Sequence, residues 1–168
     1  MIKLCWDLDG VLRNLNPIIR RKYNLYSQKT YNDWSNEGID IYDLVEKDYS
    51  VLLKAKPIKY VKVLQEYYKK YDKPIEIWSY QPYSWIMYTS EWIKQYFHRF
   101  EAHWLTPKEK FKRLQENKNI ILLDDYPNHR SYGDRLWIID QKYNHNVKCK
   151  VRIKTVEELK EKLMEINK

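Results

Sequence analysis

Two short apolar runs of this chain each end in a pair of acidic residues. The first run leads into Asp7 and Asp9, and the second, far along the chain, leads into Asp124 and Asp125. Apolar runs of this length, bounded by polar residues, are typical of buried strands in a parallel sheet. Because ligand sites of such sheets lie beyond the carboxyl ends of the strands, both acidic pairs are expected at one site.

Strand-like and helical segments alternate along most of the chain. Strands are expected where short apolar runs are bounded by polar or turn residues, and helices where apolar residues recur three and four apart. This alternation predicts an α/β fold: a Rossmann-like, mainly parallel sheet with helices on both faces. The expected strands are residues 2–8, 75–78, 100–105, 119–123 and 135–139, and the expected helices open at Pro57, Tyr83, Thr106 and Thr155.

The segment between residues 11 and 56 differs from the rest. It mixes Asn, Tyr, Trp and charged residues, and its apolar residues follow helical spacing. We interpret it as a small helical cap inserted after the first strand. The core domain is then expected to comprise residues 1–10 and 57–168, with residues 11–56 as the cap.

The chain is basic, with 31 Lys and Arg against 23 Asp and Glu and a formal net charge of +8. A basic balance favours an anionic partner, such as a nucleotide, a phosphorylated metabolite or a nucleic acid. The lysines are spread along the whole sequence, so most of them are assigned to a solvated surface. Charge alone therefore does not separate a nucleotide from a polynucleotide.

The cysteines and the hydropathy pattern indicate the cellular compartment in which the protein is expected. Cys5 and Cys149 have no spacing typical of a zinc site, and both are expected to be reduced. No apolar run approaches the roughly 18 residues of a membrane helix, and the first residues open directly into a strand rather than a signal peptide. A cytoplasmic protein with no membrane partner is expected, and a homodimer is compatible with the sequence.

The first acidic pair suggests a metal site. Asp7 and Asp9 flank Leu8 and precede Gly10, which permits a tight turn out of the strand. Residues two apart at a strand end point the same way, so both carboxyl groups can aim at one spot. An isolated Asp-x-Asp is usually only a turn, but a second acidic pair after another strand is far more specific. Converging carboxylates repel one another, and a cluster that offers only oxygens suits Mg²⁺.

Ser79 ends the strand at residues 75–78. A hydroxyl at that place can donate to a phosphoryl oxygen. The commoner role of such a serine is to cap the N-terminus of a helix. Alone, therefore, Ser79 does not identify a site.

A lysine at the start of the helix opened by Thr106 can balance anionic oxygens and keep a carboxylate ionised. Lys108 and Lys110 both lie in the first turn or so of this helix. Phe111 and Leu114 mark its apolar face, and Lys108 lies three residues before Phe111. We therefore expect Lys108 to face Asp7, with Lys110 as its competitor.

Four segments, in this order, resemble the motifs of the haloacid-dehalogenase-like (HAD) superfamily. WDLDGV is similar to the first motif, and IEIWS resembles the second, a strand that ends in Ser or Thr. PKEKF resembles the third, a lysine at a helix start, and IILLDD the fourth, an acidic pair after a strand. Together they span most of the chain outside the insertion.

The resemblance implies a Mg²⁺-dependent phosphatase with an aspartyl-phosphate intermediate. Asp7 would be the nucleophile, and Asp9 would protonate the leaving oxygen and then activate water. Asp7, the backbone carbonyl of Asp9 and Asp124 would hold the metal ion. Asp125 would assist directly or through water.

Within the superfamily, the chain is most similar to the 5'(3')-deoxyribonucleotidases. DLDGV, TYNDW in the insertion and IIDQKYN after the last expected strand carry this similarity. It implies a nucleoside monophosphate phosphatase in which Ser79 and Lys108 grip the phosphoryl oxygens and Tyr80 and Trp34 bind the substrate. The cap aromatics Tyr23, Tyr26, Tyr31 and Trp34 could stack on a base or pack the core of the cap itself.

Two other functions fit the sequence. The pI of about 9.2 favours a polynucleotide 3'-phosphatase, which would use the same motifs on nucleic-acid ends. A protein of this fold could also bind nucleotide or nucleic acid without catalysis. Every expected catalytic position is filled, and this argues against the non-catalytic alternative.

Overall fold

The structure is a computed structural model that describes residues 2–23, 35–36, 39–126, 133–145 and 148–166. Its centre is a six-stranded sheet in the order β10-β9-β8-β1-β6-β7, and all neighbouring strands are parallel. The predicted α/β architecture is confirmed. The strands are β1 (Lys3–Trp6), β6 (Ile75–Ser79), β7 (Phe100–Trp104), β8 (Ile120–Asp124), β9 (Leu136–Ile139) and β10 (Val151–Ile153).

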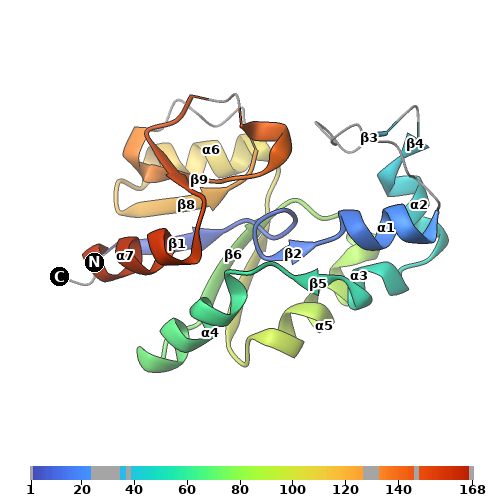
Figure 1. The fold of residues 1–168 in the computed structure, drawn as a ribbon, viewed down its shortest axis with the longest axis horizontal. Helices are drawn as coiled ribbons and strands as arrows, with labels where there is room; N and C mark the ends of the chain where they lie inside the picture. Colours follow the sequence, from blue (N-terminus) through green and yellow to red (C-terminus); the bar gives the residue numbers. More distant parts are fainter. Residues whose placement is uncertain (1, 24–34, 37–38, 127–132, 146–147, 167–168) are drawn as a thin grey trace.

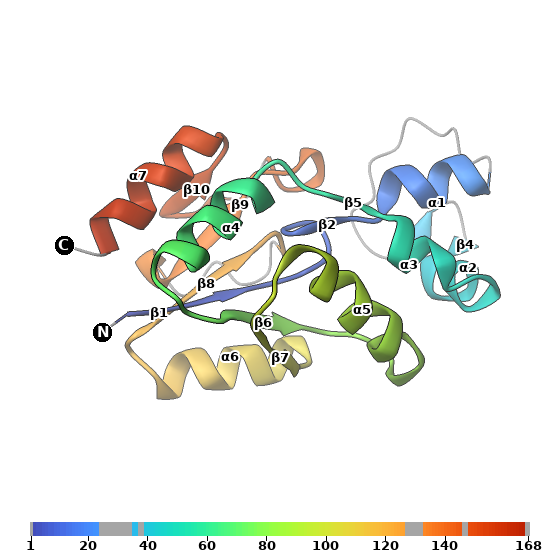
Figure 2. The ribbon, with the colours of Figure 1, turned by 90° about the horizontal axis from the view of Figure 1, so that it is seen from below.

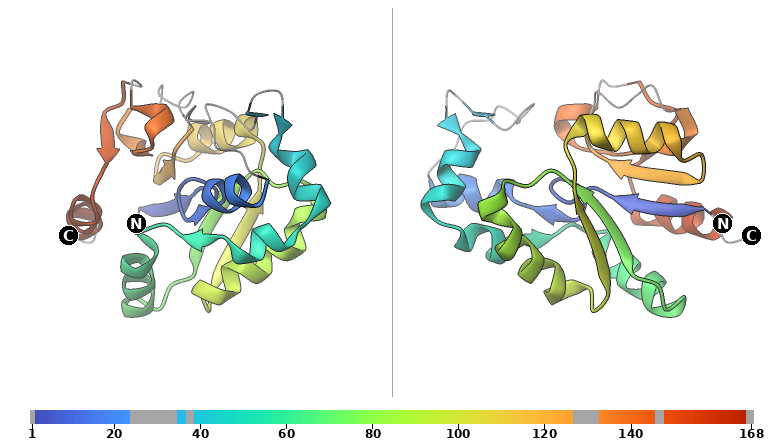
Figure 3. Two further views of the ribbon diagram at one scale, coloured as in Figure 1. Left: turned by 45° about the vertical axis from the view of Figure 1, so that its right-hand side comes forward. Right: turned by 180° about the vertical axis from the view of Figure 1, so that it is seen from behind.

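Helices cover both faces of this sheet (Figures 1 and 2). On one face, Trp6 and Ile77 pack with residues of α4 (Val61–Lys70), α5 (Ile86–Tyr96) and α7 (Val156–Ile166). On the other face, Cys5 and Trp78 pack with Leu114 of α6 (Pro107–Glu116). Successive strand residues thus alternate between two apolar cores, as the period of two in a strand requires. The right-hand view of Figure 3 shows the helices on the two faces of the sheet from behind.

Side-chain caps begin two of these helices where the sequence predicts them. The Thr106 hydroxyl accepts from the backbone N–H of Glu109, whose carboxylate accepts from the backbone N–H of Thr106. Thr155 and Glu158 repeat this reciprocal pair ahead of α7. Each capping box satisfies backbone donors that the first turn of a helix leaves without partners.

Two expected helix starts are displaced. Pro57 does not open a helix but belongs to β5 (Lys56–Pro57), which pairs antiparallel with β2 (Arg13–Asn14), and the helix begins at Val61. Tyr83 opens a 3₁₀ turn, η1 (Tyr83–Trp85), that leads into α5. Within the described residues, no helix is long and apolar enough to cross a membrane.

The described part of the predicted insertion is mainly helical. It contains α1 (Asn16–Lys22), α2 (Ile41–Lys47), α3 (Ser50–Lys54) and the short strands β3 (Ser35–Asn36) and β4 (Ile39–Asp40). Ile19, Val45 and Leu52 form an apolar core there, and Trp85 of η1 joins it. Figure 1 shows α1, α2 and α3 grouped beyond the carboxyl ends of β1 and β6.

The strand order reverses direction beside β1. From β1 the chain first builds β6 and β7 on one side, and then returns to build β8, β9 and β10 on the other. In open sheets of this kind, ligands bind outside the carboxyl ends of the strands at such a switch point. Asp7, which follows β1, and Asp124, which ends β8, lie at this switch point.

Candidate active site

Asp7 and Asp124 lie side by side at the switch point, and a buried lysine joins them. Trp6 pairs with Leu123 in the sheet, and the backbone N–H of Asp7 donates to the Leu123 carbonyl at 2.8 Å. The Lys110 Nζ donates to Asp7 Oδ1 at 2.6 Å and to Asp124 Oδ2 at 2.9 Å. One ammonium group thus bridges the ends of both predicted acidic strands.

The prediction that Lys108 faces Asp7 is wrong, because Lys108 is exposed while Lys110 is only 4% exposed. A helix turns about 100° per residue, so the two side chains point to nearly opposite sides. Leu114 marks the centre of the buried face, and Lys110 lies one turn before it, whereas Phe111 is only half-buried. Phe111 was therefore a misleading guide to the register of α6.

Asp125 completes an all-oxygen cluster with Asp7 and Asp124. One ligand atom from each of these three buried carboxylates lies within 4.8 Å of the other two. Gly10 has a φ of +86°, and a Cβ at this position would lie 2.0 Å from Asp125 Oδ2. Glycine therefore lets the turn after β1 approach Asp125. The donor set suits a hard cation such as Mg²⁺.

The electrostatics of this cluster favour a bound cation. Burial raises the pKa of Asp7 to about 7, and Asp124 adds to the rise while Lys110 opposes it. Burial also raises the pKa of Asp125 well above its usual range, with Asp124 and Asp7 contributing. Burial alone would lower the pKa of Lys110, but its two carboxylate partners outweigh that effect and raise it. The site therefore holds more acidic groups than one ammonium can balance.

Asp9 has different partners from the other acids. The Arg13 guanidinium makes a bidentate contact with its carboxylate: Nε donates to Oδ1 at 2.7 Å, and Nη2 donates to Oδ2 at 2.9 Å. Gln81 Nε2 also donates to Asp9 Oδ2 at 2.8 Å. Sequence reasoning missed Arg13 and Gln81, since neither belongs to a motif; the spacing of four residues between Asp9 and Arg13 was the one available cue.

Ser79 lies where it was predicted, buried at the end of β6. Its Oγ accepts a hydrogen bond from Gln81 Nε2 at 3.2 Å, and it does not cap a helix. The next residue, Tyr80, is 49% exposed. Ser79 and Asp9 are thus linked through one amide group.

Tyr42, an aromatic residue of the described part of the insertion, interacts electrostatically with the acids. Burial raises the pKa of Tyr42 to about 12, and the nearby Asp9 and Asp7 add to this rise. The Tyr42 ring packs on Trp85 with the centroids 5.1 Å apart. Sequence reasoning favoured other cap aromatics instead. Of those, Tyr23 donates its hydroxyl to a backbone carbonyl within the insertion, and Tyr26, Tyr31 and Trp34 lie outside the described residues.

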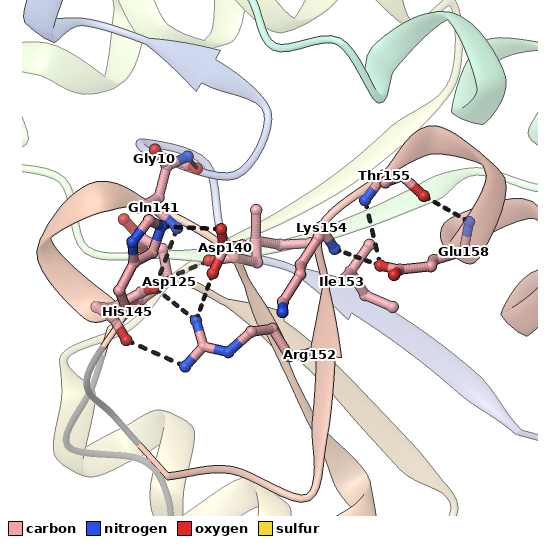
Figure 4. A network of polar contacts seen from close by, with 12 residues as sticks. Gly10, Asp125, Asp140, Gln141, His145, Arg152, Ile153, Lys154, Thr155 and Glu158 are labelled. Atoms are coloured by element: carbon pink, nitrogen blue, oxygen red, sulfur yellow. Dashed lines mark hydrogen bonds and ion pairs between the residues drawn. The ribbon is translucent and has the colours of Figure 1, made fainter.

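A polar network behind the site supports the two acidic turns (Figure 4). Gln141 Nε2 donates to the Gly10 carbonyl at 2.6 Å. Asn144 Nδ2 donates to the carbonyls of Asp125 and Ile139, both at 2.9 Å. The segment IIDQKYN therefore holds the turn after β1 and the turn after β8 in register.

Comparison with known proteins shows the fold. No protein-family model matches the chain, and no curated protein matches it at a significant level. A predicted phosphatase from Clostridium acetobutylicum superposes with a TM-score of 0.63 at 14% identity, over 98% of both chains. CbbY from Rhodobacter sphaeroides in complex with phosphate gives 0.62 at 13%, over 95% of this chain and 96% of that one. A HAD family hydrolase from Deinococcus radiodurans with bound phosphate and sodium gives 0.58 at 11%, over 98% and 96%.

These superpositions establish the architecture of the chain. The chain has the fold of the HAD-like hydrolases, with a parallel six-stranded sheet at its centre. Its acidic cluster lies at the carboxyl ends of the central strands of that sheet.

Proposed function

We propose that this chain, which shares its fold with HAD-like hydrolases, is a Mg²⁺-dependent phosphomonoester hydrolase that is transiently phosphorylated on Asp7. The observation that carries the proposal is the bridge from Lys110 Nζ to Asp7 and Asp124, beside Asp125, at the switch point of the sheet. Two proteins of this fold have been solved with phosphate bound.

In the first half-reaction, a carboxylate oxygen of Asp7 attacks the phosphorus and forms an aspartyl-phosphate. The bond from phosphorus to the leaving oxygen breaks, and Asp9 gives a proton to that oxygen. Lys110 stabilises the negative charge of the transferring group, and the Ser79 hydroxyl donates to one of its oxygens.

In the second half-reaction, water attacks the phosphorus of the aspartyl-phosphate. Asp9 takes a proton from this water, so it returns to its protonated form. The bond between phosphorus and Asp7 breaks, which regenerates the carboxylate and releases inorganic phosphate. Asp9 therefore acts once as acid and once as base in each cycle.

Asp7, Asp124 and Asp125 would hold Mg²⁺, with the backbone carbonyl of Asp9 as a further ligand. When bound, Mg²⁺ neutralises charge on the phosphoryl oxygens and on the crowded carboxylates. The fit rests on the all-oxygen donor set and on the raised pKa values of Asp7 and Asp125.

For the substrate, we propose a nucleoside monophosphate. Aromatic side chains from several elements lie at or near the site: Tyr42 of α2, and the exposed Tyr80 and Tyr126, which follow Ser79 and Asp125. Such rings can stack on a base. Trp34 remains a second predicted contact. Residues 11–56 would act as the cap over a core formed by the rest of the chain.

A phosphate-release screen with and without Mg²⁺ tests this proposal. The substrates would be deoxyribonucleoside 5'- and 3'-monophosphates, pentose and hexose phosphates, and an oligonucleotide with a 3'-phosphate. We expect turnover only with Mg²⁺ and with mononucleotides as the best substrates. A preference for the oligonucleotide would mean that the protein is a polynucleotide 3'-phosphatase rather than a nucleotidase. CbbY was also solved with xylulose-1,5-bisphosphate, so a preference for sugar phosphates would instead place this chain's substrate in that class.

A further inference from the structure

Arg13 is a completely buried cation beside the proposed acid–base residue. Its guanidinium is 0% exposed and forms the two-point contact with Asp9. Its Nη1 also donates to Thr89 Oγ1 at 3.2 Å, and its Nη2 to Gln81 Oε1 at 3.3 Å. Burying a charge is costly unless it is paired and hydrogen-bonded, so the network must form as a unit.

The backbone places Arg13 against Asp9 by a tight turn. The Arg13 N–H donates to the Leu8 carbonyl at 2.8 Å, and its carbonyl accepts from the Gly10 N–H at 3.0 Å. The turn that presents the acidic pair therefore also fixes the start of the arginine side chain. Any movement of Arg13 is coupled to the position of Asp9.

The far side of the guanidinium is held by α5. Thr89 accepts its hydrogen bond, and the Trp92 ring packs 5.7 Å from the guanidinium carbon. The Thr89 hydroxyl in turn donates to Gln81 Oε1 at 3.1 Å. A planar fork held at this many points has little freedom to rotate.

This arrangement leaves Asp9 in one orientation. A carboxylate offers about four lone-pair sites. Among the described residues, three hydrogen bonds reach that of Asp9: one from Arg13 Nε to Oδ1, and two to Oδ2, from Arg13 Nη2 and Gln81 Nε2. In the proposed reaction, a proton in transit would use the lone pair of Oδ1 that these three contacts leave open. A bidentate contact supplies this geometric control, which a point charge cannot.

We propose that Arg13 is a positioning residue for proton transfer by Asp9, with Thr89 and Gln81 holding Arg13 in turn. The inference rests on the proposed function, because it assigns Arg13 a role in that reaction. Arg13 acts through Asp9 and touches neither the nucleophile nor the transferred group. Its loss must therefore affect turnover more than substrate binding.

A double-mutant cycle between Arg13 and Asp9 tests this role. Arg13→Ala should lower kcat by about 10- to 10³-fold, a large part of what an acid–base group contributes, and change KM and the half-saturating Mg²⁺ concentration by less than about 3-fold. In an Asp9→Asn background, the same change should lower kcat by less than about 3-fold more, because groups that act as a unit are not additive. The same fold-loss of kcat in both backgrounds would overturn the proposal.

Two further measurements separate positioning from simple stabilisation. Added guanidinium should restore part of kcat in Arg13→Ala, whereas Arg13→Lys, which keeps the charge but loses the fork, should stay impaired. A full recovery with lysine, or no response to guanidinium, would contradict the role of the fork.

A milder pair of variants covers the case in which the Arg13 variants fail to fold. Thr89→Val removes the hydroxyl that accepts from Arg13 while keeping the shape of the side chain, and Thr89→Ser keeps the hydroxyl. Valine should lower kcat more than serine with KM little changed; the reverse order would refute the proposal. Absence of turnover in the wild type would refute the proposed function and this inference together. If turnover depends on Asp9 but the losses of kcat caused by the Arg13 and Asp9 substitutions are additive, only the inference is refuted.

Discussion

The Nζ of Lys110 lies 2.6 Å from the Oδ1 of Asp7, across 103 positions of sequence. Two of the four motif-like segments therefore meet in one charge-assisted hydrogen bond. The same ammonium reaches Asp124 of a third segment. In the proposed reaction, this contact favours the ionised form of the nucleophile, against the effect of burial, and stabilises the phosphoryl group.

The first prediction concerns the two lysines at the start of α6. Lys110→Met keeps most of the length of the side chain but removes the charge, and should lower kcat by about 10²–10³-fold, the range seen when one such stabilising donor is lost. Lys108→Met is the matched control, because Lys108 is exposed on the same turn, and should retain near-normal turnover. Steady-state kinetics on both purified variants would measure kcat. A larger loss of kcat in Lys108→Met than in Lys110→Met would mean that Lys108 is the motif lysine.

The second prediction concerns Asp9. Asp9→Asn removes proton transfer and keeps the backbone carbonyl, so kcat should fall by about 10²–10⁴-fold while Mg²⁺ still binds. Turnover and calorimetric Mg²⁺ titration would be measured on the same protein. A variant with an unchanged rate, in conditions where chemistry limits turnover, would exclude Asp9 as the acid–base group.

The third prediction compares two glycines with positive φ. Gly10→Ala would drive its Cβ into Asp125, whereas Gly133, with a φ of +62°, has nothing within 4 Å of such a Cβ. Both changes should lower the free energy of unfolding through backbone strain, by about 1–3 kcal/mol. Only Gly10→Ala should also weaken Mg²⁺ binding, by about 10-fold or more, because it displaces a ligand. Equal Mg²⁺ affinities in the two variants would argue against Asp125 as part of the metal site.

The fourth prediction is a pH dependence of stability. Burial raises the pKa of Asp7 from 3.8 to about 7, so the folded state binds a proton that the unfolded state loses at lower pH. This contribution to stability is present at acid pH and is lost as pH rises toward about 7. Mg²⁺ should reduce that loss, because it binds the ionised carboxylates. Urea unfolding across this range, with and without Mg²⁺, measures the effect.

Asp7→Asn provides the control for this pH series, because it removes the titrating group. Its unfolding free energy should depend less on pH than that of the wild type when Mg²⁺ is left out. If the two proteins show the same slope between about pH 4 and pH 7, the raised pKa of Asp7 would not be the cause.

The parts of the fold that were predicted from the sequence depend on local signals. The capping box that begins at Thr106 is a contact within one turn of helix, and β1 and β8 are apolar runs with polar ends. β10 was missed, because Val151–Ile153 is short and its strand conformation depends on pairing with β9.

The residues of the candidate site also divide into those that local sequence signals predicted and those that depend on tertiary contacts. Its acids were found because they end or directly follow apolar strands, and Ser79 was found because it ends one. The choice between Lys108 and Lys110 depended on which residue marks the buried face of α6. Phe111 served as that mark, but it is only partly buried, so the wrong lysine was chosen. Arg13 was missed, since its contacts depend on a tight turn and on Thr89, a residue of a distant helix.

The central claim is that Asp7 becomes phosphorylated, and rapid quenching followed by peptide mass spectrometry tests it most directly. The Asp9→Asn variant would be mixed with Mg²⁺ and an aryl phosphate whose leaving group is acidic, so that formation of the intermediate needs little help from an acid. The intermediate should then accumulate, because removal of the base slows attack by water. The account predicts a phosphoryl group on the peptide that contains Asp7, and none when Asp7 is also replaced by Asn. Phosphate release by a folded Asp7→Asn enzyme at a near-normal rate, or a phosphoryl group found on a different residue, would contradict it.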